Sequence, residues 1–282
     1  MILNRPWMPR HHLDHRPAMA MRWLKGNGLE IGALHKPTPL PEGASVAYVD
    51  YKTRAENEKT YPELAGETIV ETHHVGDGFS LDFIARESQD FVIANHALEH
   101  SPDPWGTLET WWAKLRQGGV LYVTVPAADK CFDRGRPISS LREIRRAHRN
   151  FVRMDRDAMI AETSRRLREF ITISDANIRR DNHLPPGDPA EQENFTKGRI
   201  DDLGTRLQAA RNGGELFAAH IAAINRIYDI HYFTFSPVSF LTLGIVFCAT
   251  HGGWLADIRK SGGGEIIMIL RKIRGHGLRR RA

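Results

Sequence analysis

Three side chains capable of acid–base chemistry stand close together just after a short apolar stretch of the sequence. His96, Glu99 and His100 follow the apolar residues that end at Ala94, which we expect to form a strand. Ligands of an open parallel sheet bind beyond the carboxyl ends of its strands, so we expect these side chains at such an edge. Histidine has an unperturbed pKa near ~6.5 and can take a hydroxyl proton near neutral pH. His96, Glu99 and His100 are therefore our candidate catalytic residues.

The spacing of these residues also matches the H-x-x-E-H pattern of inverted zinc proteases. That pattern requires a continuous helix, whereas here an apolar strand precedes it and Pro102 and Pro104 follow at once. We therefore reject the protease interpretation.

A second group of residues is typical of nucleoside binding. Leu29–Ile31 reads as a buried strand that runs into a glycine turn at Gly32, and Asp50 ends the next apolar run eighteen residues later. Glycine lets the backbone approach a ligand, and a carboxylate at this place accepts hydrogen bonds from ribose hydroxyls. A single glycine followed by several prolines is a poor pyrophosphate cradle. The pattern therefore favours a nucleoside ligand without phosphates.

Four segments in order resemble the motifs of class I S-adenosylmethionine-dependent methyltransferases, in the group with a Leu-Glu-His signature followed by Asp-Pro. They are Glu30-Ile31-Gly32-Ala33, Asp50, Gly76-Asp77-Gly78-Phe79 and Ala94-Asn95-His96-Ala97-Leu98-Glu99-His100. The resemblance covers about residues 20–130 and, more weakly, 231–272. It implies S-adenosyl-L-methionine as the cofactor. The residues it assigns to this cofactor are Glu30, Gly32, Ala33, Asp50, Tyr51, Asp77, Gly78, Phe79 and Asn95. Asp77 would face the adenine amino group, although an Asp that only makes a turn fits its spacing equally well.

Two shorter resemblances concern the acceptor and a metal. Cys131-Phe132-Asp133-Arg134-Gly135-Arg136-Pro137 is similar to a segment of methyltransferases encoded with bacterial surface-polysaccharide systems. It suggests that Asp133, Arg134, Arg136 and His231 bind the acceptor, and an internal ion pair is an equally good explanation for the charged residues of this segment. Glu99-His100 is similar to the metal-binding segment of small-RNA 2′-O-methyltransferases, with His231 as a further ligand. Because His96 replaces the first Glu of that motif, we favour a structural role and expect no metal.

The remaining segments predict the architecture. Beside the strands above, we expect strands over 68–75, 90–94, 120–125, 254–260 and 265–271, and helices over 18–25, 53–61, from Pro104 to a stop at Gly118-Gly119, and from Pro237 to Cys248. Alternating strands and helices indicate an α/β fold, a doubly wound, seven-stranded and mostly parallel sheet. The sheet is interrupted by helices at 140 onward, 157–170 and 199–228, the last broken at Gly213-Gly214, and by a loop over 182–196.

The predicted domains follow from these elements. We expect a flexible arm over 1–16, a methyltransferase domain over 17–128 and 230–272, a helical insertion that caps the acceptor over 129–229, and a basic tail over 273–282. The net charge is +5, and residues 271–282 hold six Lys and Arg and no acid, which leaves −1 on the rest. The pI of about 9.3 is therefore a property of the tail.

These observations set the expected function. Two cysteines and no apparent signal peptide or long apolar run indicate a cytoplasmic protein without a transmembrane segment. We expect S-adenosylmethionine-dependent O-methylation of a glycan or small-metabolite acceptor. The alternatives are an RNA methyltransferase, with nucleic acid as the less favoured partner, and a non-catalytic nucleoside-binding or scaffold module.

Overall fold

The computed structural model describes residues 15–224 and 230–273. The predicted arm up to residue 14 and the predicted tail beyond residue 273 lie outside these ranges, as do residues 225–229. The chain divides into two compact units. Unit 1 comprises the residues up to Ala97, Leu108–Val125 and the residues from Phe240 on; unit 2 comprises Leu98–Thr107 and Pro126–Ser239.

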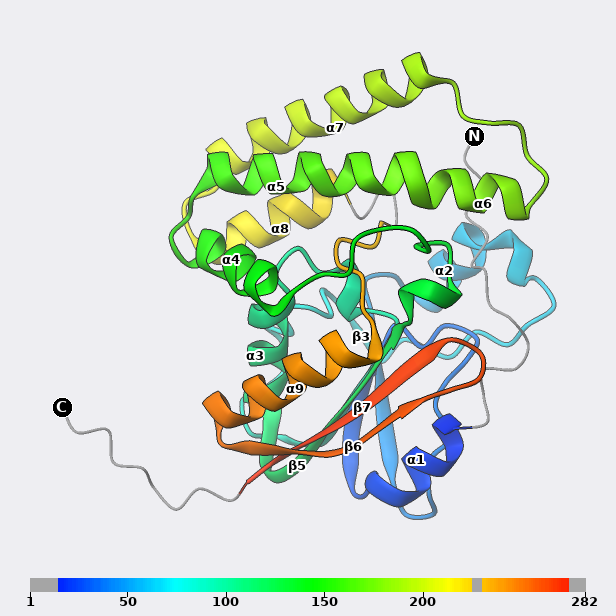
Figure 1. Cartoon of the computed structure of the whole chain (residues 1–282). Coiled ribbons are helices and arrows are strands. Elements are labelled where there is room, and N and C mark those ends of the chain that lie inside the picture. The colour runs from blue at the N-terminus through cyan, green and yellow to red at the C-terminus, as the bar shows by residue number, and fades with distance from the viewer. Residues whose placement is uncertain (1–14, 225–229, 274–282) are drawn as a thin grey trace. The chain divides into compact units, whose positions relative to one another are not determined.

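Unit 1 is built on a single sheet, which confirms the predicted fold class (Figure 1). Within the described residues the sheet has seven strands in the order β3-β2-β1-β4-β5-β7-β6. The strands are β1 (Asn27–Ile31), β2 (Ser45–Asp50), β3 (His74–Val75), β4 (Gln89–Asn95), β5 (Leu115–Pro126), β6 (Gly253–Lys260) and β7 (Glu265–Lys272). β6 pairs with β7 antiparallel, whereas the pairs among β1 to β5 are parallel. The predicted strand over 68–75 shrinks to the two residues of β3.

Helices cover both faces of this sheet, because its central strands are apolar on both sides. On one face, Ile267 and Ile269 of β7 pack with Met19 and Leu24 of the helix segment α1 (His15–Trp23) and the residue that follows it. The alternate β7 residues face α9 (Pro237–His251), where a Cβ added to Gly244 would lie 2.4 Å from Met268 Sδ. Because side chains alternate along a strand, β7 contacts a helix on each face of the sheet.

The shorter helices of this unit follow their capping residues. α2 (Arg54–Thr60) starts at a capping box formed by Thr53 and Glu56 and is followed by the 3₁₀ turn η1 (Pro62–Leu64). α3 (Pro104–Lys114) starts after Asp103, whose carboxylate accepts a hydrogen bond from the backbone N–H of Gly106 at 3.0 Å. The prediction that Gly118-Gly119 ends α3 is wrong. The helix ends at Lys114 and β5 begins at once, because Leu115 pairs with Gln89 of β4.

Unit 2 consists mainly of helices. They are η2 (Leu98–His100), η3 (Ala128–Lys130), α4 (Leu141–Val152), α5 (Arg156–Glu169), the π-helix η4 (Phe170–Asp175), α6 (Ala176–Asp181), α7 (Pro189–Ala209) and α8 (Gly213–Ala223). The predicted capping box of α4 is present, since the Ser140 side chain and the Glu143 side chain each accept from the other's backbone N–H. α5, η4 and α6 follow one another without a break, and the extra residue of the π-turn shifts the direction of the side chains after it.

Two predictions within unit 2 are wrong. The loop expected over 182–196 ends at Asp188, because its side chain caps α7 and Pro189 takes the first helical position. Gly213 and Gly214 do not break a helix. They begin α8 after the cap residue Asn212, and the break lies just before it.

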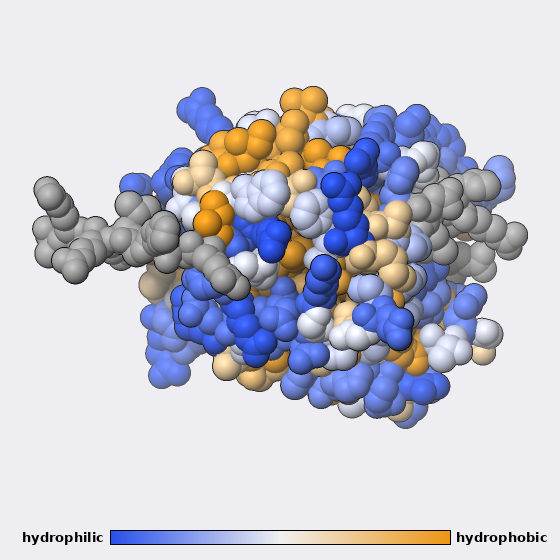
Figure 2. Space-filling model, turned by 90° about the horizontal axis from the view of Figure 1, so that it is seen from below, coloured by the Kyte–Doolittle hydropathy of each residue, from blue (hydrophilic) through white to orange (hydrophobic). Residues whose placement is uncertain are grey.

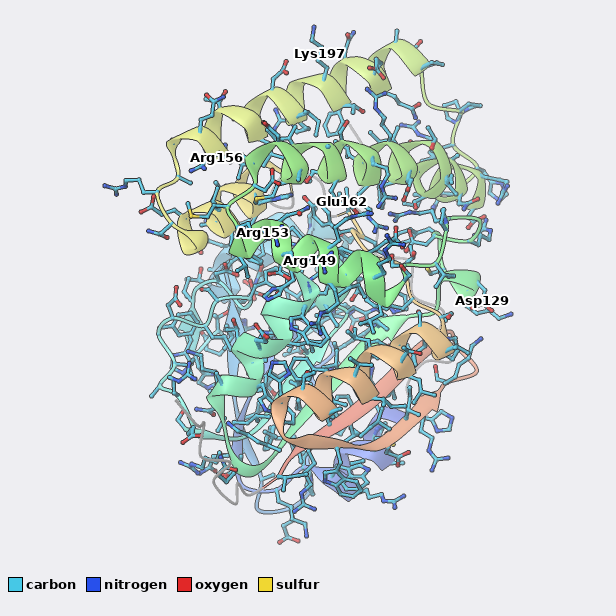
Figure 3. All side chains as sticks on the ribbon, turned by 60° about the vertical axis from the view of Figure 1, so that its left-hand side comes forward. Asp129, Arg149, Arg153, Arg156, Glu162 and Lys197 are labelled. Atoms are coloured by element: carbon cyan, nitrogen blue, oxygen red, sulfur yellow. The ribbon has the colours of Figure 1, made fainter. Side chains whose placement is uncertain are left out.

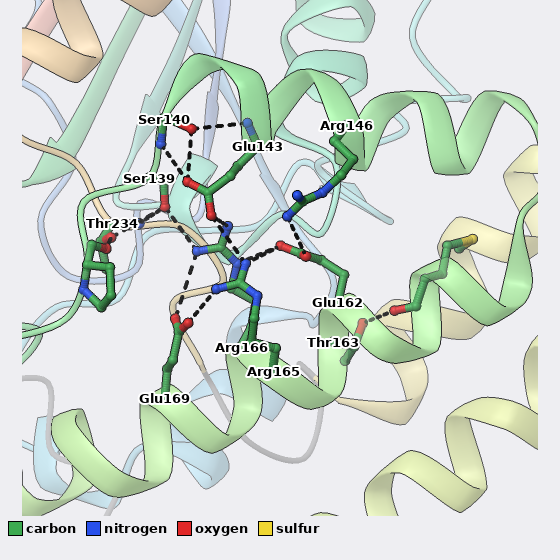
Figure 4. A network of polar contacts seen from close by, with 12 residues as sticks. Ser139, Ser140, Glu143, Arg146, Glu162, Thr163, Arg165, Arg166, Glu169 and Thr234 are labelled. Carbon is green, nitrogen blue, oxygen red and sulfur yellow. Dashed lines mark hydrogen bonds and ion pairs between the residues drawn. The ribbon is translucent and has the colours of Figure 1, made fainter.

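A buried arginine joins the segments of unit 2 (Figure 4). The Arg166 guanidinium lies 2.9 Å from Glu162 and 3.2 Å from Ser139 Oγ, and it stacks 4.5 Å from the centre of the Phe233 ring. Burial lowers the pKa of Arg166, although neighbouring carboxylates oppose that shift. Because Ser139 and Phe233 belong to different loops, Arg166 fixes both loops to α5.

Several other arginines of unit 2 form ion pairs on its surface, among them Arg146 with Glu162 and Arg206 with Asp202. Arg149 and Arg153 on α4 and Lys197 on α7 are exposed (Figure 3). Arg156 instead donates to the carbonyls of Leu207 and Ala210 at the end of α7. In residues 15–224 and 230–273, no helix has both the length and the hydropathy to cross a membrane.

Candidate functional site

The glycine turn after β1 is open. Gly32 has φ +66°, a conformation that favours glycine, and a Cβ placed on it would meet nothing within 4 Å. Its backbone N–H donates to the Val49 carbonyl of β2 at 2.9 Å, so the turn stays in register with the neighbouring strand. Ala33 after it is buried. The turn therefore leaves room for a ligand beyond the end of β1.

A buried network holds this turn to the sheet. Both carboxylate oxygens of Glu30 accept from the Thr38 N–H at 3.0 Å, and one also accepts from the Thr38 hydroxyl at 2.7 Å. Asn95 Nδ2 donates to Glu30 at 3.0 Å, and Asn95 Oδ1 accepts from the Thr124 hydroxyl. Burial raises the pKa of Glu30, and these hydrogen bonds offset part of the rise. In this structure Glu30 and Asn95 thus position the turn, while their contact with a cofactor stays a prediction.

Asp50 lies where the sequence predicts, at the carboxyl end of β2. Its Oδ1 accepts from the Lys52 N–H at 3.0 Å, and it also bonds the side chain of Asn57. Burial raises the pKa of Asp50 despite these bonds. The next residue, Tyr51, is exposed, with the Lys52 ammonium 4.9 Å from its ring centre. The predicted ribose-binding carboxylate of Asp50 therefore lies next in the sequence to the exposed Tyr51 ring.

The turn after β3 carries the predicted acid and glycine. Asp77 Oδ1 accepts from the Phe79 N–H at 2.9 Å, which is the turn-making role left open for this residue. The Gly78 carbonyl accepts from Trp111 Nε1 at 2.7 Å. A Cβ on Gly78 would lie 2.4 Å from Ile31 Cγ2, so only glycine lets this turn approach the end of β1.

His96 is held by an acid that the sequence analysis missed. Its Nε2 lies 2.7 Å from Glu265 Oε1, and Glu265 also forms a buried ion pair with Arg16 of α1. Burial alone would raise the pKa of Glu265, but His96 and Arg16 outweigh it and lower that pKa. His96 also has φ 52°, an uncommon conformation for a residue other than glycine. All of these residues belong to unit 1.

The other candidate residues belong to unit 2, where one buried pair dominates. His231 Nδ1 lies 2.5 Å from Asp133 Oδ2, and both side chains are almost completely buried. Asp133 also accepts from Arg136 at 2.8 Å and from Ser174 Oγ of the π-helix at 2.7 Å. Burial alone would raise the pKa of Asp133, but His231 and Arg136 lower it far below its usual value. Asp133 is therefore an ionised carboxylate that orients His231.

Glu99 and His100 lie against the same histidine. The His100 and His231 rings are 4.7 Å apart in an edge-to-face arrangement, and His100 Nδ1 lies 2.9 Å from the Ile230 carbonyl. The Glu99 carbonyl accepts from the N–H of Tyr232 at 2.7 Å, which fixes the loop after residue 229 to η2. The structure thus brings Glu99, His100 and His231 together, as the metal alternative supposed, and gives His96 different partners.

The two predicted acceptor arginines have internal partners. Arg136 is completely buried, and it donates to Asp133 and to the His231 carbonyl at 2.8 Å. Arg134 is about one-third exposed and forms a two-pronged ion pair with Asp181, at 2.9 and 2.6 Å. In this structure both Arg134 and Arg136 therefore form internal ion pairs, which was the alternative to acceptor binding. Only Arg134 offers a surface that an acceptor could reach.

Among the residues of unit 2 that the structure describes, two groups of side chains have metal-ligand chemistry. In each group the ligand atoms lie within 4.8 Å of one another, and both groups contain His231. The first adds Glu99 and His100, and the second adds Cys131 and Asp133. Burial and the charge of Asp133 raise the pKa of the Cys131 thiol strongly, so it stays protonated and is a poor ligand. The group of Glu99, His100 and His231 is the one whose chemistry suits a divalent ion.

A family comparison agrees with this arrangement. Residues 25–123 match the family model described as "Methyltransferase domain". The match contains the glycine turn, Asp50, the Asp77 turn and the Leu-Glu-His segment. This part of the chain is a class I S-adenosylmethionine-dependent methyltransferase domain. Its cofactor is S-adenosyl-L-methionine, which fits the open Gly32 turn with an acid at the end of the next strand.

Several solved structures are distantly similar. One is a SAM-dependent methyltransferase from Aquifex aeolicus, with 8% identity, a TM-score of 0.42 and coverage of 93% of this chain and 90% of that one. Another is the complex of the Haloferax volcanii Trm112 methyltransferase activator with a putative methyltransferase, with 11% identity, a TM-score of 0.46 and coverage of 95% and 90%. A third, from Methanococcus maripaludis, is described as a putative S-adenosyl-L-methionine-dependent methyltransferase, with 12% identity, a TM-score of 0.39 and coverage of 92% and 86%. A search of curated proteins finds no match. Similarities this low say nothing about the acceptor.

Proposed function

We propose that the chain transfers a methyl group to an oxygen of a glycan or a small polar metabolite. The observation that carries the proposal is the buried pair of His231 and Asp133, whose side chains lie 2.5 Å apart. When bound, S-adenosyl-L-methionine supplies an electrophilic methyl group, so the chain needs no nucleophile of its own. Its own residues must align the acceptor and receive a proton.

An oxygen acceptor needs a base, and the pair has the chemistry of one. In the neutral ring of His231, Nδ1 donates its hydrogen to the ionised Asp133, so Nε2 carries the lone pair. The acceptor hydroxyl would lose its proton to Nε2 as its oxygen takes the methyl group. The carboxylate then stabilises the positive ring, as in other His–Asp pairs. His100, beside His231, is the second candidate base.

A polar, hydroxyl-rich acceptor is supported by the segment that contains Asp133. Its sequence is similar to one found in methyltransferases of surface-polysaccharide systems, and its Arg134 is partly exposed. We propose that unit 2 selects this acceptor, because the methyltransferase match stops at residue 123, before most of unit 2. We also propose a cytoplasmic location. Both cysteines lie within the described residues and are free thiols, as a reducing compartment would keep them.

The experiment is an acceptor screen with the purified full chain. Release of S-adenosylhomocysteine is measured with panels of oligosaccharides, nucleotide sugars, small polyhydroxy metabolites and a structured RNA. The product of any active acceptor is then analysed by mass spectrometry and NMR to locate the new methyl group. We expect O-methylation of a sugar or small polyol. Turnover with the RNA alone, or methylation at nitrogen or carbon, contradicts the proposal. Binding of S-adenosylhomocysteine without any turnover favours the non-catalytic alternative.

A further inference from the structure

Unit 2 contains a small cavity between its helices. The lining residues come from α4, α5, α8, Pro102 and the segment 232–233, and all of them belong to unit 2. The hollow has a volume of about 270 Å³, which includes its open mouth, and its enclosed part has room for about one hydroxyl group. Asn150 and Glu162 are partly exposed, whereas the other lining residues are buried. The mouth of the cavity therefore lies beside these two residues of α4 and α5.

Two polar atoms of the lining side chains have no hydrogen-bond partner in the part of the chain that the structure describes. They are Nδ1 of His220 and the hydroxyl of Tyr232, and both side chains are only 2% exposed. The two rings meet edge to face with their centres 5.4 Å apart, and the Phe151 ring stacks on His220 at 5.7 Å. Buried polar atoms are nearly always paired. Together the two atoms indicate that the cavity takes a polar occupant.

The hydrogen bonds of His220 define what its free nitrogen can do. The Thr163 hydroxyl donates to the Met159 carbonyl at 2.8 Å (Figure 4), so it accepts the hydrogen of His220 Nε2, 2.9 Å away. Burial lowers the pKa of His220 to about 3, so the ring is neutral near pH 7. Nδ1 of His220 therefore carries a lone pair and accepts a hydrogen bond.

Tyr232 supplies the opposite function. Burial raises the pKa of Tyr232 well above its usual value, so its hydroxyl keeps its hydrogen and can donate. An alcohol can donate to His220 Nδ1 and accept from Tyr232, through one hydroxyl or through two neighbouring hydroxyls. A carboxylate or a phosphate dianion has no hydrogen to give to Nδ1, and an ammonium group has no lone pair for Tyr232. The pair of atoms therefore matches a hydroxyl-bearing ligand.

The cavity has no unbalanced charge that would attract an ion. Arg166 and Glu162 both line it, and they pair with each other at 2.9 Å. Pro102, Phe151 and Phe233 give it apolar walls. Apolar side chains elsewhere lie open to solvent, as the hydrophobic patches in Figure 2 show, whereas these three are buried. A neutral ligand is therefore favoured.

We propose that this cavity binds a hydroxyl group of a small neutral polyol or sugar, which donates a hydrogen bond to His220 and accepts one from Tyr232. A site built in this way rejects an analogue without the hydroxyl, because its buried polar atoms would then stay unpaired. The inference concerns a binding site and does not depend on the acceptor or the base proposed above.

The test is an NMR titration of the full chain with glycerol and, separately, with inorganic phosphate. It follows the nitrogen signals of the histidine rings, and the signals of His220 are identified by their absence in His220→Gln. Tyr232→Phe removes one hydroxyl from the cavity, and Tyr48→Phe, which removes a hydroxyl from unit 1, is the matched control. Ala147→Val narrows the cavity without changing a polar atom. Circular dichroism shows whether each variant is folded.

We expect glycerol to shift the Nδ1 signal of His220 in a saturable way and phosphate to leave it unchanged. Tyr232→Phe should bind glycerol about tenfold less tightly, as the loss of one hydrogen bond would cause, while Tyr48→Phe should bind it as the wild type does. The proposal is overturned if glycerol leaves the His220 signal unchanged, because the cavity then holds water alone. It is also overturned if phosphate causes the same shift, or if Tyr232→Phe keeps the affinity of the wild type. Should Tyr232→Phe fail to fold, the affinity of Ala147→Val decides in the same way.

Discussion

Asp133 and His231 are 98 residues apart in the sequence, yet their side chains share a 2.5 Å hydrogen bond in the interior of unit 2. Asp133 follows the last sheet strand before the helices of unit 2, and His231 stands where the chain leaves them. The pair therefore joins the beginning and the end of the insertion. In the proposed reaction, the same contact orients His231 as the base.

The first prediction separates these two roles of the pair. His231→Gln keeps an amide N–H that can donate to Asp133 but removes the basic nitrogen. We expect kcat to fall by about 10²–10⁴-fold, the usual contribution of a general base, with little change in thermal stability or cofactor affinity. His183→Gln, at an exposed position of the same unit, is the control. An unchanged kcat would show that the pair is only structural.

The second prediction concerns the group of Glu99, His100 and His231. If a base and not a metal drives the reaction, EDTA leaves turnover undiminished and elemental analysis finds no stoichiometric divalent ion. The control is the same measurement after addition of Zn²⁺ or Mn²⁺. A bound ion whose removal abolishes turnover would establish the metal alternative and assign these three side chains as its ligands.

The third prediction is that Arg134 and Arg136, the two arginines of the Asp133 segment, have different roles. Arg134→Ala removes a partly exposed ion pair, which costs at most about 1 kcal/mol of stability, and should raise the KM for the acceptor while leaving cofactor affinity unchanged. Arg168→Ala is the matched control, since Arg168 forms the same two-pronged contact with Glu193 on another surface. An equal rise in the acceptor KM of Arg134→Ala and Arg168→Ala would contradict a specific role for Arg134.

Arg136→Ala has a different expected outcome. Arg136 is buried against the Asp133 carboxylate, so its removal should cost about 3–5 kcal/mol of stability. Urea unfolding measures this loss directly.

The fourth prediction is a pH dependence of stability that arises at His220. Its Nε2 donates to the Thr163 hydroxyl at 2.9 Å, which itself donates to the Met159 carbonyl, and burial lowers the pKa of His220 to about 3. Between about pH 6.5 and pH 3, His220 is therefore protonated in the unfolded chain and neutral in the folded chain. Stability should fall by up to about 1.4 kcal/mol per pH unit from about pH 6.5 towards 3.

Urea unfolding at a series of pH values checks this slope. His220→Gln keeps an N–H donor without a titrating group and should lose the slope, whereas His183→Gln should keep it. An identical pH dependence in the wild type and His220→Gln would assign the acid sensitivity to other groups.

The sheet could be predicted from the sequence because its signals are local. β1 and β4 are short apolar runs that end in glycine or polar residues, and each was found within a few residues of its observed ends. The start of β5 was missed, because it was predicted at Val120 and the strand begins at Leu115. The strand predicted over 68–75 was too long, because only His74 and Val75 pair with β2. The start of α7 was missed although Asp188-Pro189 is a local signal for a helix start, since the neighbouring prolines suggested a loop.

The candidate site was less predictable, because its contacts join distant segments. No local pattern indicates that Glu265 of β7 would bind both His96 and Arg16, 169 and 249 residues away. Arg16 lies in α1, at the end of the segment predicted to be a flexible arm. Ser174 reaches Asp133 only because a π-turn interrupts the path from α5 to α6, and that turn has no strong sequence signal.

The most direct test of the account is calorimetric titration of the purified chain with S-adenosylhomocysteine and with NAD, repeated for Asp50→Ala and for the control Asp82→Ala, an exposed acid of the same unit. We predict saturable binding of S-adenosylhomocysteine, no binding of NAD, and a loss of about 1.5–3 kcal/mol in Asp50→Ala alone, the range for a hydrogen bond to a charged group. Binding of NAD in place of S-adenosylhomocysteine, or an Asp50→Ala variant with wild-type affinity, would contradict the cofactor site described here.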